Sequence, residues 1–175
     1  VLRTRPKVLV SASSPRGNPE FRAVLAKRAL GMGVTLSPDD VQITNGCIEA
    51  LNLALRAVAR PGDTIAVESP TFYGLLQVLE SLGLRALEIP TSPQTGISLD
   101  ALEMAMQTYD NIKAVVVVPH LQNPLGSIMP DAHKQGLVQL CERHGVALIE
   151  DDTYSELVSE GTRGDTPLRA MKSWD

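Results

Sequence analysis

The stretch Val146-Ala147-Leu148-Ile149-Glu150-Asp151-Asp152-Thr153-Tyr154 decides the fold class of this chain. Its four apolar residues follow Gly145 and precede an acidic cluster, which predicts a strand buried on both faces of a parallel sheet. The acids then fall at the carboxyl end of that strand, where open α/β sheets bind their ligands. A buried Asp is costly without a cationic partner, and no Lys or Arg lies within about ten residues downstream. A bound cofactor with a protonated ring nitrogen would suit this position.

Strand-like and helix-like patterns alternate along the rest of the chain. The expected strands lie at residues 41–44, 64–67, 85–89, 113–119 and 146–149. The expected helices lie at residues 19–30, 47–60, 73–82, 99–108 and 130–144. Because strands that alternate with helices are joined by right-handed crossovers, the sequence predicts a three-layer α/β/α fold with a mostly parallel sheet.

Composition and charge restrict the class of protein. The 175 residues suffice for one domain with a core, and 43% apolar content with a net charge of −4 is ordinary for a globular chain. The acidic balance disfavours binding to nucleic acid phosphates, and no apolar run reaches the roughly 20 residues that cross a bilayer. Cys47 and Cys141 are far apart and lie inside helical patterns. We therefore expect free thiols, no metal site, no membrane association and a cytoplasmic location.

The turn Asn45-Gly46-Cys47 follows the first expected strand and opens a helix. A glycine allows a ligand to approach the backbone, and the free amides of a first helical turn attract anions such as a phosphate monoester. A tight strand–helix turn without any ligand explains the same residues. The turn lacks the lysine of a nucleotide-binding loop, which disfavours ATP.

Two other segments follow strands. Phe72 and Tyr73 come together in a chain with only 3% aromatic residues, so a flat heteroaromatic ligand could stack there, although core packing under the next helix is the alternative. Asn123-Pro124-Leu125-Gly126 predicts a rigid turn whose Asn amide could donate to a ligand, and the turn alone explains its Pro and Gly. His120 is more typical of a hydrogen-bonded loop residue than of a catalyst.

Asp151 and Tyr154 follow the last expected strand and share one face if the chain turns helically there. An ordinary acidic first turn of a helix is the alternative. Each candidate segment is weak alone. Together they follow one order at strand ends: a phosphate turn, an aromatic residue, Asn-Pro-x-Gly and Asp-x-x-Tyr.

These motifs closely resemble those of the pyridoxal-phosphate-dependent class I/II aminotransferases of fold type I. The likeness runs from about Gly17 to Pro167. It rests on Thr44–Leu51 as the phosphate turn, on Pro61–Phe72, on Gln122–Gly126 with Leu125 in place of Thr, and on Asp151–Tyr154. Within that family, Gln122–Pro130 and Glu150–Tyr154 look most like the MocR type, in which a GntR-type winged-helix DNA-binding domain precedes an aminotransferase-like domain.

The resemblance implies a role for each site residue. Asp151 would pair with the pyridine nitrogen, and Phe72 would stack on the ring. Tyr154 and Asn123 would bond the phenolic oxygen of the ring. Asn45, Gly46 and Cys47 form the segment that would hold the phosphate. The implied reaction moves an amino group from an amino acid to a 2-oxo acid, and the family's sites form at a dimer interface, so we expect a homodimer.

Besides Leu125, the chain departs from the family pattern because it lacks both the Schiff-base Lys and the Arg that usually holds the substrate α-carboxylate. The Schiff-base Lys, expected in a Ser-x-x-Lys context, does not occur, and Lys172 has the wrong context. We therefore expect no catalytic residue within the chain and no transamination by the 175 residues alone. The chain has no initiator Met and looks like a piece of a longer polypeptide. We expect residues 1–18 to be an N-terminal arm or linker, and residues 19–175 to be a partial large domain with a gapped or rearranged sheet and exposed apolar edges.

Three functions fit these features. The first is a catalytic aminotransferase domain. The second is the effector domain of a GntR/MocR-type regulator, which would sense pyridoxal phosphate or an amino acid and would contact DNA only through a separate N-terminal domain. The third is a degenerate domain kept for dimerisation. The identity of the amino acid lies beyond this sequence.

Overall fold

The structure, a computed structural model, describes residues 3–4, 14–159 and 167–175, which fall into two compact units, Val1–Thr44 and Asn45–Asp175. The first unit contains helix α1 (Pro19–Ala29) and two short 3-10 helices, η2 (Leu30–Met32) and η3 (Pro38–Asp40). The expected helix is therefore confirmed, with its last residue in a 3-10 turn.

Polar contacts help to hold α1 in its unit. Phe21 and Val24 are half exposed, whereas Arg22 is buried. The Arg22 guanidinium donates to the Pro38 carbonyl at 2.8 Å and to the Asp39 carboxylate at 3.2 Å. The buried face of α1 therefore includes a charged side chain whose guanidinium is hydrogen-bonded within the unit.

Residues 41–44 do not form the expected strand. Within this unit, the Ile43 N–H donates to the Arg16 carbonyl at 3.1 Å. The segment forms no ladder with another strand in the described part of the chain. A strand needs such a ladder, and sequence pattern alone does not supply the partner.

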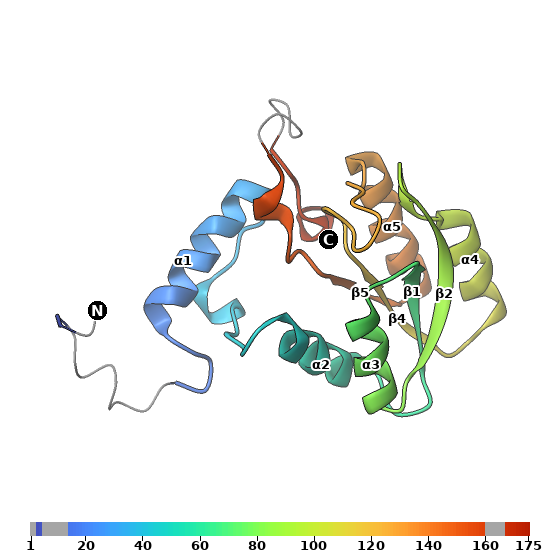
Figure 1. The fold of residues 1–175 in the computed structure, drawn as a ribbon, viewed down its shortest axis with the longest axis horizontal. Helices are drawn as coiled ribbons and strands as arrows, with labels where there is room; N and C mark the ends of the chain where they lie inside the picture. The colour runs from blue at the N-terminus through green and yellow to red at the C-terminus, as the bar shows by residue number, and fades with distance from the viewer. Residues whose placement is uncertain (1–2, 5–13, 160–166) are drawn as a thin grey trace. The chain divides into compact units, whose positions relative to one another are not determined.

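The second unit is built on a five-stranded sheet with the order β3-β2-β1-β4-β5 (Figure 1). The strands are β1 (Thr64–Ser69), β2 (Arg85–Ser92), β3 (Gly96–Ile97), β4 (Ile112–Val117) and β5 (Ala147–Glu150). β1 pairs in parallel with β2 and β4, and β4 pairs in parallel with β5. Only the short β3, which the sequence did not predict, is antiparallel. The mostly parallel sheet is confirmed, and these five strands pair without the expected gap.

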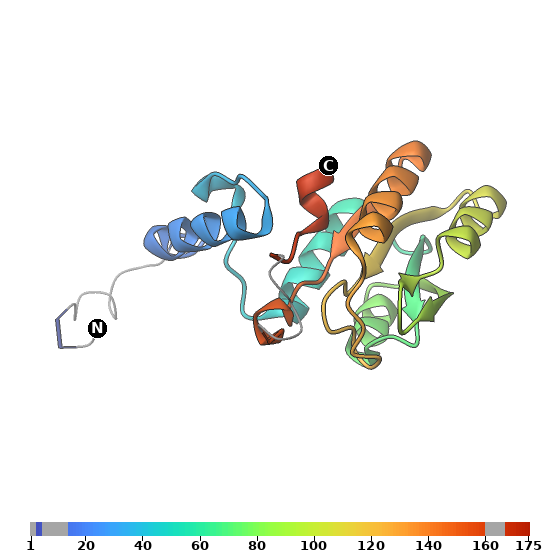
Figure 2. The same cartoon turned by 90° about the horizontal axis from the view of Figure 1, so that it is seen from above.

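Helices cover both faces of the sheet, as Figures 1 and 2 show. They are α2 (Cys47–Val58), α3 (Tyr73–Ser81), α4 (Leu99–Thr108) and α5 (Asp131–His144). Ile65 and Val67 of β1 pack with α2 and α3, whereas Ala66 packs with α4 and α5. This alternation follows from the two-residue period of a strand. It gives the three-layer α/β/α fold that the sequence predicts.

The helix boundaries follow local capping rules. Ser98 accepts a hydrogen bond from the Ala101 N–H and caps α4. Gly145 ends α5 in the left-handed conformation, with φ 62°. Pro130 is the N-cap of α5 rather than its first residue, so the helix begins at Asp131.

Strand β5 differs from the prediction of a strand buried on both faces. All four of its residues are half-buried, because β5 pairs with β4 alone. The central strands β1 and β4 are the ones whose residues are mostly buried. The continuous apolar run therefore predicted the strand correctly but placed it too deep in the sheet.

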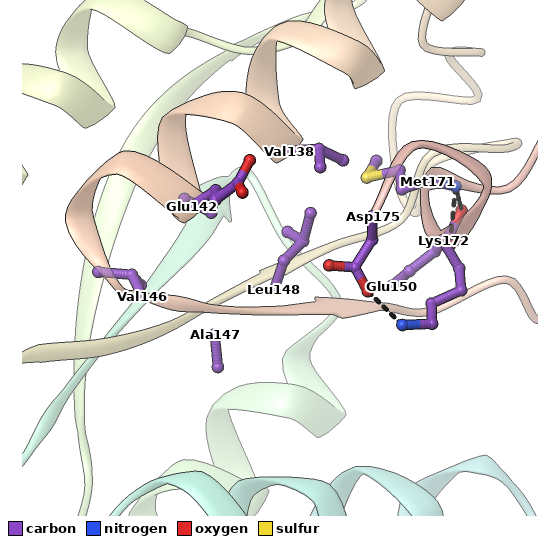
Figure 3. Close-up of a pocket in the computed structure, with 10 residues that line it drawn as sticks. Val138, Glu142, Val146, Ala147, Leu148, Glu150, Met171, Lys172 and Asp175 are labelled. Carbon is purple, nitrogen blue, oxygen red and sulfur yellow. Dashed lines mark hydrogen bonds and ion pairs between the residues drawn. The ribbon is translucent and has the colours of Figure 1, made fainter. Parts of the chain in front are cut away.

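Beside β5 lies a cavity of about 330 Å³, shown in Figure 3. Leu148 points from β5 toward α5, and Ala147 points to the opposite face of the sheet. The cavity also borders the 3-10 helix η5 (Met171–Trp174), whose Met171 N–H donates to Glu150 Oε1 at 2.9 Å. Burial raises the pKa of the Glu150 carboxyl group above its ordinary value. This face of β5 is only partly covered by the described residues.

No helix in the described ranges is both long and apolar enough to cross a bilayer. The same residues contain no cluster of three His, Cys, Asp or Glu side chains that could hold a metal ion. Cys47 and Cys141 are both free thiols.

Candidate functional site

The carboxyl ends of β1, β4 and β5 meet at one edge of the sheet, and a cavity of about 260 Å³ opens there. β2 and β4 lie on opposite sides of β1, so the cavity is at a topological switch point, where open α/β sheets bind ligands. Its lining residues come from the start of α2 and from the loops after β1, β4 and β5. They are Asn45, Gly46, Cys47, Ile48, Leu51, Phe72, Val118, Asn123, Asp151, Thr153 and Tyr154.

The structure brings every predicted site residue to this one cavity. The predicted residues are Asn45, Gly46, Cys47, Phe72, Asn123, Asp151 and Tyr154. They come from four segments that are up to about a hundred residues apart in sequence, and the parallel pairing of β1, β4 and β5 brings the loops after these strands to the same edge of the sheet. The volume of the cavity is close to the lower end of the range of roughly 300–1,000 Å³ that is typical of small-molecule sites.

Gly46 begins the helix α2 at one side of the cavity. Its φ of 96° lies in a region that favours glycine, and no other group lies within 4 Å of the position that a Cβ atom would take. No side chain caps this helix end. The Glu49 carboxylate instead folds back to accept from the Asn45 N–H at 2.5 Å and from its side-chain amide at 3.1 Å. The N–H groups of the first turn have no acceptor within the helix, so this end attracts an anion.

The Asp151 carboxylate also lines the cavity, and its hydrogen bonds to described residues are all on one oxygen, Oδ1. The Thr153 hydroxyl donates to Asp151 Oδ1 at 2.6 Å, and the Thr153 N–H donates to it at 3.2 Å. Cys47 Sγ lies 3.4 Å from the same oxygen. Burial, together with the nearby Asp151 charge, raises the pKa of the Cys47 thiol. Within the described residues, no hydrogen bond reaches Asp151 Oδ2, which leaves that oxygen available to a ligand.

Phe72 is half-buried at the start of α3, and its neighbour Tyr73 is exposed. The two rings are in contact, with centroids 4.9 Å apart and planes at 59°. Gly74 makes room for the Phe72 ring, because a Cβ atom at Gly74 would lie 2.4 Å from Phe72 Cε1. The alternative of two core residues is therefore wrong for Tyr73, and Phe72 presents its ring to the cavity.

Gln122 holds the turn that carries Asn123, and the sequence analysis did not identify it as a site residue. Its buried side-chain amide donates to the Pro70 carbonyl at 2.9 Å, and its Oε1 accepts from the Leu125 N–H at 2.8 Å. The Gly126 N–H closes the turn on the Gln122 carbonyl at 2.5 Å. Gln122 therefore ties the loop before Phe72 to the turn of Asn123.

Glu68 lies beneath both loops and is 1% exposed. Its Oε2 accepts from the Val118 N–H at 3.0 Å and from the Gln122 amide at 3.3 Å. Its Oε1 is buried without a hydrogen-bond partner among the described residues. Burial raises the pKa of Glu68 to about 7, so this carboxyl group changes charge near neutral pH.

Two polar groups of the cavity have no protein partner. Within the described ranges, neither the Asn123 side-chain amide nor the Tyr154 hydroxyl is hydrogen-bonded to another residue. Both side chains are half-buried. Both groups are therefore available to hydrogen-bond a polar ligand in the cavity.

Comparisons with known proteins show which family of proteins the chain resembles. The sequence profile described as Aminotransferase class I and II matches residues 9–172. Two proteins of Escherichia coli (strain K12) are similar, both described as uncharacterized HTH-type transcriptional regulators. YdcR is 46% identical over the whole chain and 36% of its own length, and YjiR is 45% identical over 91% of the chain and 33% of its own length.

A solved structure agrees with this relationship. The kynurenine aminotransferase of Pyrococcus horikoshii, solved with PMP, has a TM-score of 0.87 and 27% identity, and the match covers 99% of this chain and 43% of that one. The present chain spans about a third of the length of its curated relatives. The chain belongs to the class I and II aminotransferase family, and it has the three-layer fold of fold-type I aminotransferases.

Proposed function

We propose that the cavity at the carboxyl ends of β1, β4 and β5 binds pyridoxal 5'-phosphate in an aminotransferase-like domain. One observation carries this proposal: four separate segments, each with one of the family's motifs, line a single cavity. PMP, a form of the same cofactor, is present in the P. horikoshii structure.

The residues of the cavity fit the two charged ends of this cofactor. The open space at Gly46 and the first-turn amides of α2 suit a phosphate. Asp151 provides a carboxylate with one oxygen that no described residue contacts. A cavity with an anion-binding end and an acid suits a ligand that carries both a phosphate and a protonated ring nitrogen.

The position of each site residue supports a specific role in binding the cofactor. Asp151 would keep a proton on the ring nitrogen, and Phe72 would stack on the flat ring. Asn123 and Tyr154 would donate to the phenolic oxygen of the ring with the groups that lack protein partners. Asn45 and Cys47 flank Gly46 and would hold the phosphate together with its backbone. When bound, pyridoxal phosphate supplies an electron-withdrawing ring that stabilises negative charge at the α-carbon of an amino acid.

The described residues place no lysine in this cavity, and Lys172 borders the other cavity beside β5. A group that moves the α-proton of a substrate is therefore missing from the lining. We propose that the 175-residue chain does not transaminate by itself, and that the full-length protein moves an amino group from an amino acid to a 2-oxo acid. We further propose an arm or linker at residues 1–18, a partial cofactor-binding domain at residues 19–175, a homodimer and a cytoplasmic location.

A second function is favoured by the two E. coli relatives, which are described as HTH-type regulators and share 45% and 46% identity with the chain. In this alternative, the same cavity senses pyridoxal phosphate or an amino acid. DNA would be bound through a separate N-terminal domain.

The test uses the protein expressed from its complete gene. Titration with pyridoxal phosphate, followed by absorbance and equilibrium dialysis, should give saturable binding with one site per chain. Turnover of an amino acid with a 2-oxo acid would favour the enzyme. Binding of the amino acid without turnover, together with a change in DNA affinity, would favour the sensor. No binding of pyridoxal phosphate at millimolar concentration would contradict the enzyme, and no binding of either pyridoxal phosphate or an amino acid would contradict both functions.

A further inference from the structure

A buried lysine and a buried histidine lie next to the proposed cofactor site, and no role above uses them. Lys134 of α5 is 1% exposed and His120 is fully buried. The three donors of the Lys134 ammonium group match three acceptors. They are His120 Nε2 at 2.8 Å, the Arg169 carbonyl at 2.8 Å and Asp131 Oδ1 at 3.2 Å. A buried ammonium group is tolerated only with such full hydrogen bonding.

The contact with Lys134 determines which nitrogen of His120 carries the hydrogen. Lys134 can only donate, so His120 Nε2 accepts. In a neutral imidazole the hydrogen is then on Nδ1. His120 Nδ1 lies 2.5 Å from Asp152 Oδ1, so it donates to the Asp152 carboxylate. The lysine thereby orients a histidine that in turn holds an aspartate.

Asp152 is the residue after Asp151, whose carboxylate lines the cavity. The Ser155 hydroxyl donates to the other Asp152 oxygen, Oδ2, at 2.7 Å. On the preceding side, the Asp151 N–H donates to the Val117 carbonyl at 2.9 Å and continues the pairing of β5 with β4. The backbone at Asp151 is therefore fixed on both sides, by the sheet before it and by the Asp152 contacts after it.

We propose that Lys134 and His120 are positioning residues: through Asp152 they set the orientation of the Asp151 carboxylate toward the ring nitrogen of the cofactor. This rests on the proposed function, because it assumes that Asp151 meets that nitrogen. The hydrogen bonds from Lys134 through His120 end on Asp152, which is the residue adjacent to Asp151. A role in core packing alone is better served by apolar side chains, because burying charges requires their desolvation.

Two substitutions of His120 separate its two contacts. His120→Gln places a polar group near the position of Nε2 and keeps a partner for Lys134, but it removes the donor to Asp152. His120→Asn places an N–H donor near the position of Nδ1 and keeps the contact with Asp152. Lys172→Met is a control, because Lys172 is an exposed lysine that pairs with Asp175.

The experiment measures the dissociation constant of pyridoxal phosphate for the full-length protein by equilibrium dialysis, and the absorbance maximum of the bound cofactor. We expect His120→Gln to raise the dissociation constant about 10- to 100-fold, the range known for supporting partners of ligating groups, and to shift the absorbance maximum. In His120→Asn, the dissociation constant and the absorbance maximum should both stay near their wild-type values. Lys172→Met should change neither of them. A loss of packing alone would lower the melting temperature without moving the absorbance maximum.

Equal effects of His120→Gln and His120→Asn, or a wild-type spectrum and affinity in His120→Gln, would overturn the proposal. If His120→Gln does not fold, Ser155→Ala replaces it, and the loss of one donor to Asp152 should raise the dissociation constant about fivefold. An unchanged constant in Ser155→Ala would then overturn it. A wild-type protein that binds no pyridoxal phosphate would contradict the proposed function itself, and with it this inference.

Discussion

The two sides of the loops that follow β1, β4 and β5 differ in how their polar groups are bonded. Beneath the loops, Gln122 and Lys134 are buried and their polar side-chain atoms have protein partners, whereas Glu68 has one bonded and one unbonded carboxylate oxygen among the described residues. On the cavity side, Asn123, Tyr154 and one oxygen of Asp151 have none among the described residues. The difference indicates a scaffold that fixes the loops and leaves one set of polar groups for a ligand, as preorganised sites do.

Removing the charge of Asp151 should have the largest effect on the cavity side. Asp151→Asn leaves a protonated ring nitrogen without its counter-charge, and breaking a buried charge pair costs about 3 kcal/mol or more. The dissociation constant of pyridoxal phosphate should therefore rise more than about 100-fold. Equilibrium dialysis with the full-length protein measures it, and Asp100→Asn in the first turn of α4 serves as the matched control. Equal affinity of the two variants would refute the role of Asp151.

Removing the charge of Lys134 should have the largest effect beneath the loops. Lys134→Met leaves Asp131 and His120 without their donor, so the free energy of unfolding should fall by about 3–5 kcal/mol. Chemical denaturation monitored by circular dichroism measures this change. The matched exposed variant Lys172→Met should stay within about 0.5 kcal/mol. Similar losses of unfolding free energy in Lys134→Met and Lys172→Met would contradict a stabilising role for the buried hydrogen bonds of Lys134.

Glu68 should make the stability of the fold depend on pH. Its pKa is raised to about 7 from 4.5, so the folded state retains a proton that the unfolded state releases. The proton that Glu68 retains therefore stabilises the folded state by about 3 kcal/mol. This stabilisation is fully present below about pH 4.5 and is lost as the pH rises through about 7. In Glu68→Gln this titration is absent. The unfolding free energy should therefore fall less between pH 5 and pH 8 in the variant than in the wild type, and parallel curves would count against a buried, titrating Glu68.

The smallest effect is expected at Gly74, next to the Phe72 ring. Gly74→Ala places a Cβ atom 2.4 Å from that ring, so the ring must move, at about 1–3 kcal/mol of stability. Gly31→Ala is the matched control, because nothing lies within 4 Å of the added Cβ atom there. Thermal unfolding compares the two variants. If Gly74→Ala melts like the control, the Phe72 ring is not held in place by this contact.

The sequence predicted what depends on local pattern and missed what depends on distant partners. The apolar runs of β1 and β4 predicted strands, and the motifs at Gly46, Asn123 and Asp151 predicted residues that the fold brings to one cavity. The expected strand at 41–44 failed, because its pattern does not reveal whether a neighbouring strand exists. β5 was placed too deep for the same reason.

The supporting residues were missed because their partners are remote in sequence. Gln122 bonds to Pro70, which is 52 positions away, and Lys134 bonds to Arg169, which is 35 positions away. One local signal was present. Lys134 lies three, four and seven positions before Leu137, Val138 and Cys141, on the apolar face of α5. A lysine on an apolar helix face indicates a buried partner, and this rule would have identified the network.

The most direct test of the central claim is a crystal structure of the full-length protein soaked with pyridoxal phosphate. The account predicts that the phosphate lies at the first turn of α2, beside Gly46 and Cys47, and that the ring lies between Phe72 and the Asp151 carboxylate. Cofactor density at any other place on the protein, or a ring nitrogen remote from Asp151, would contradict it.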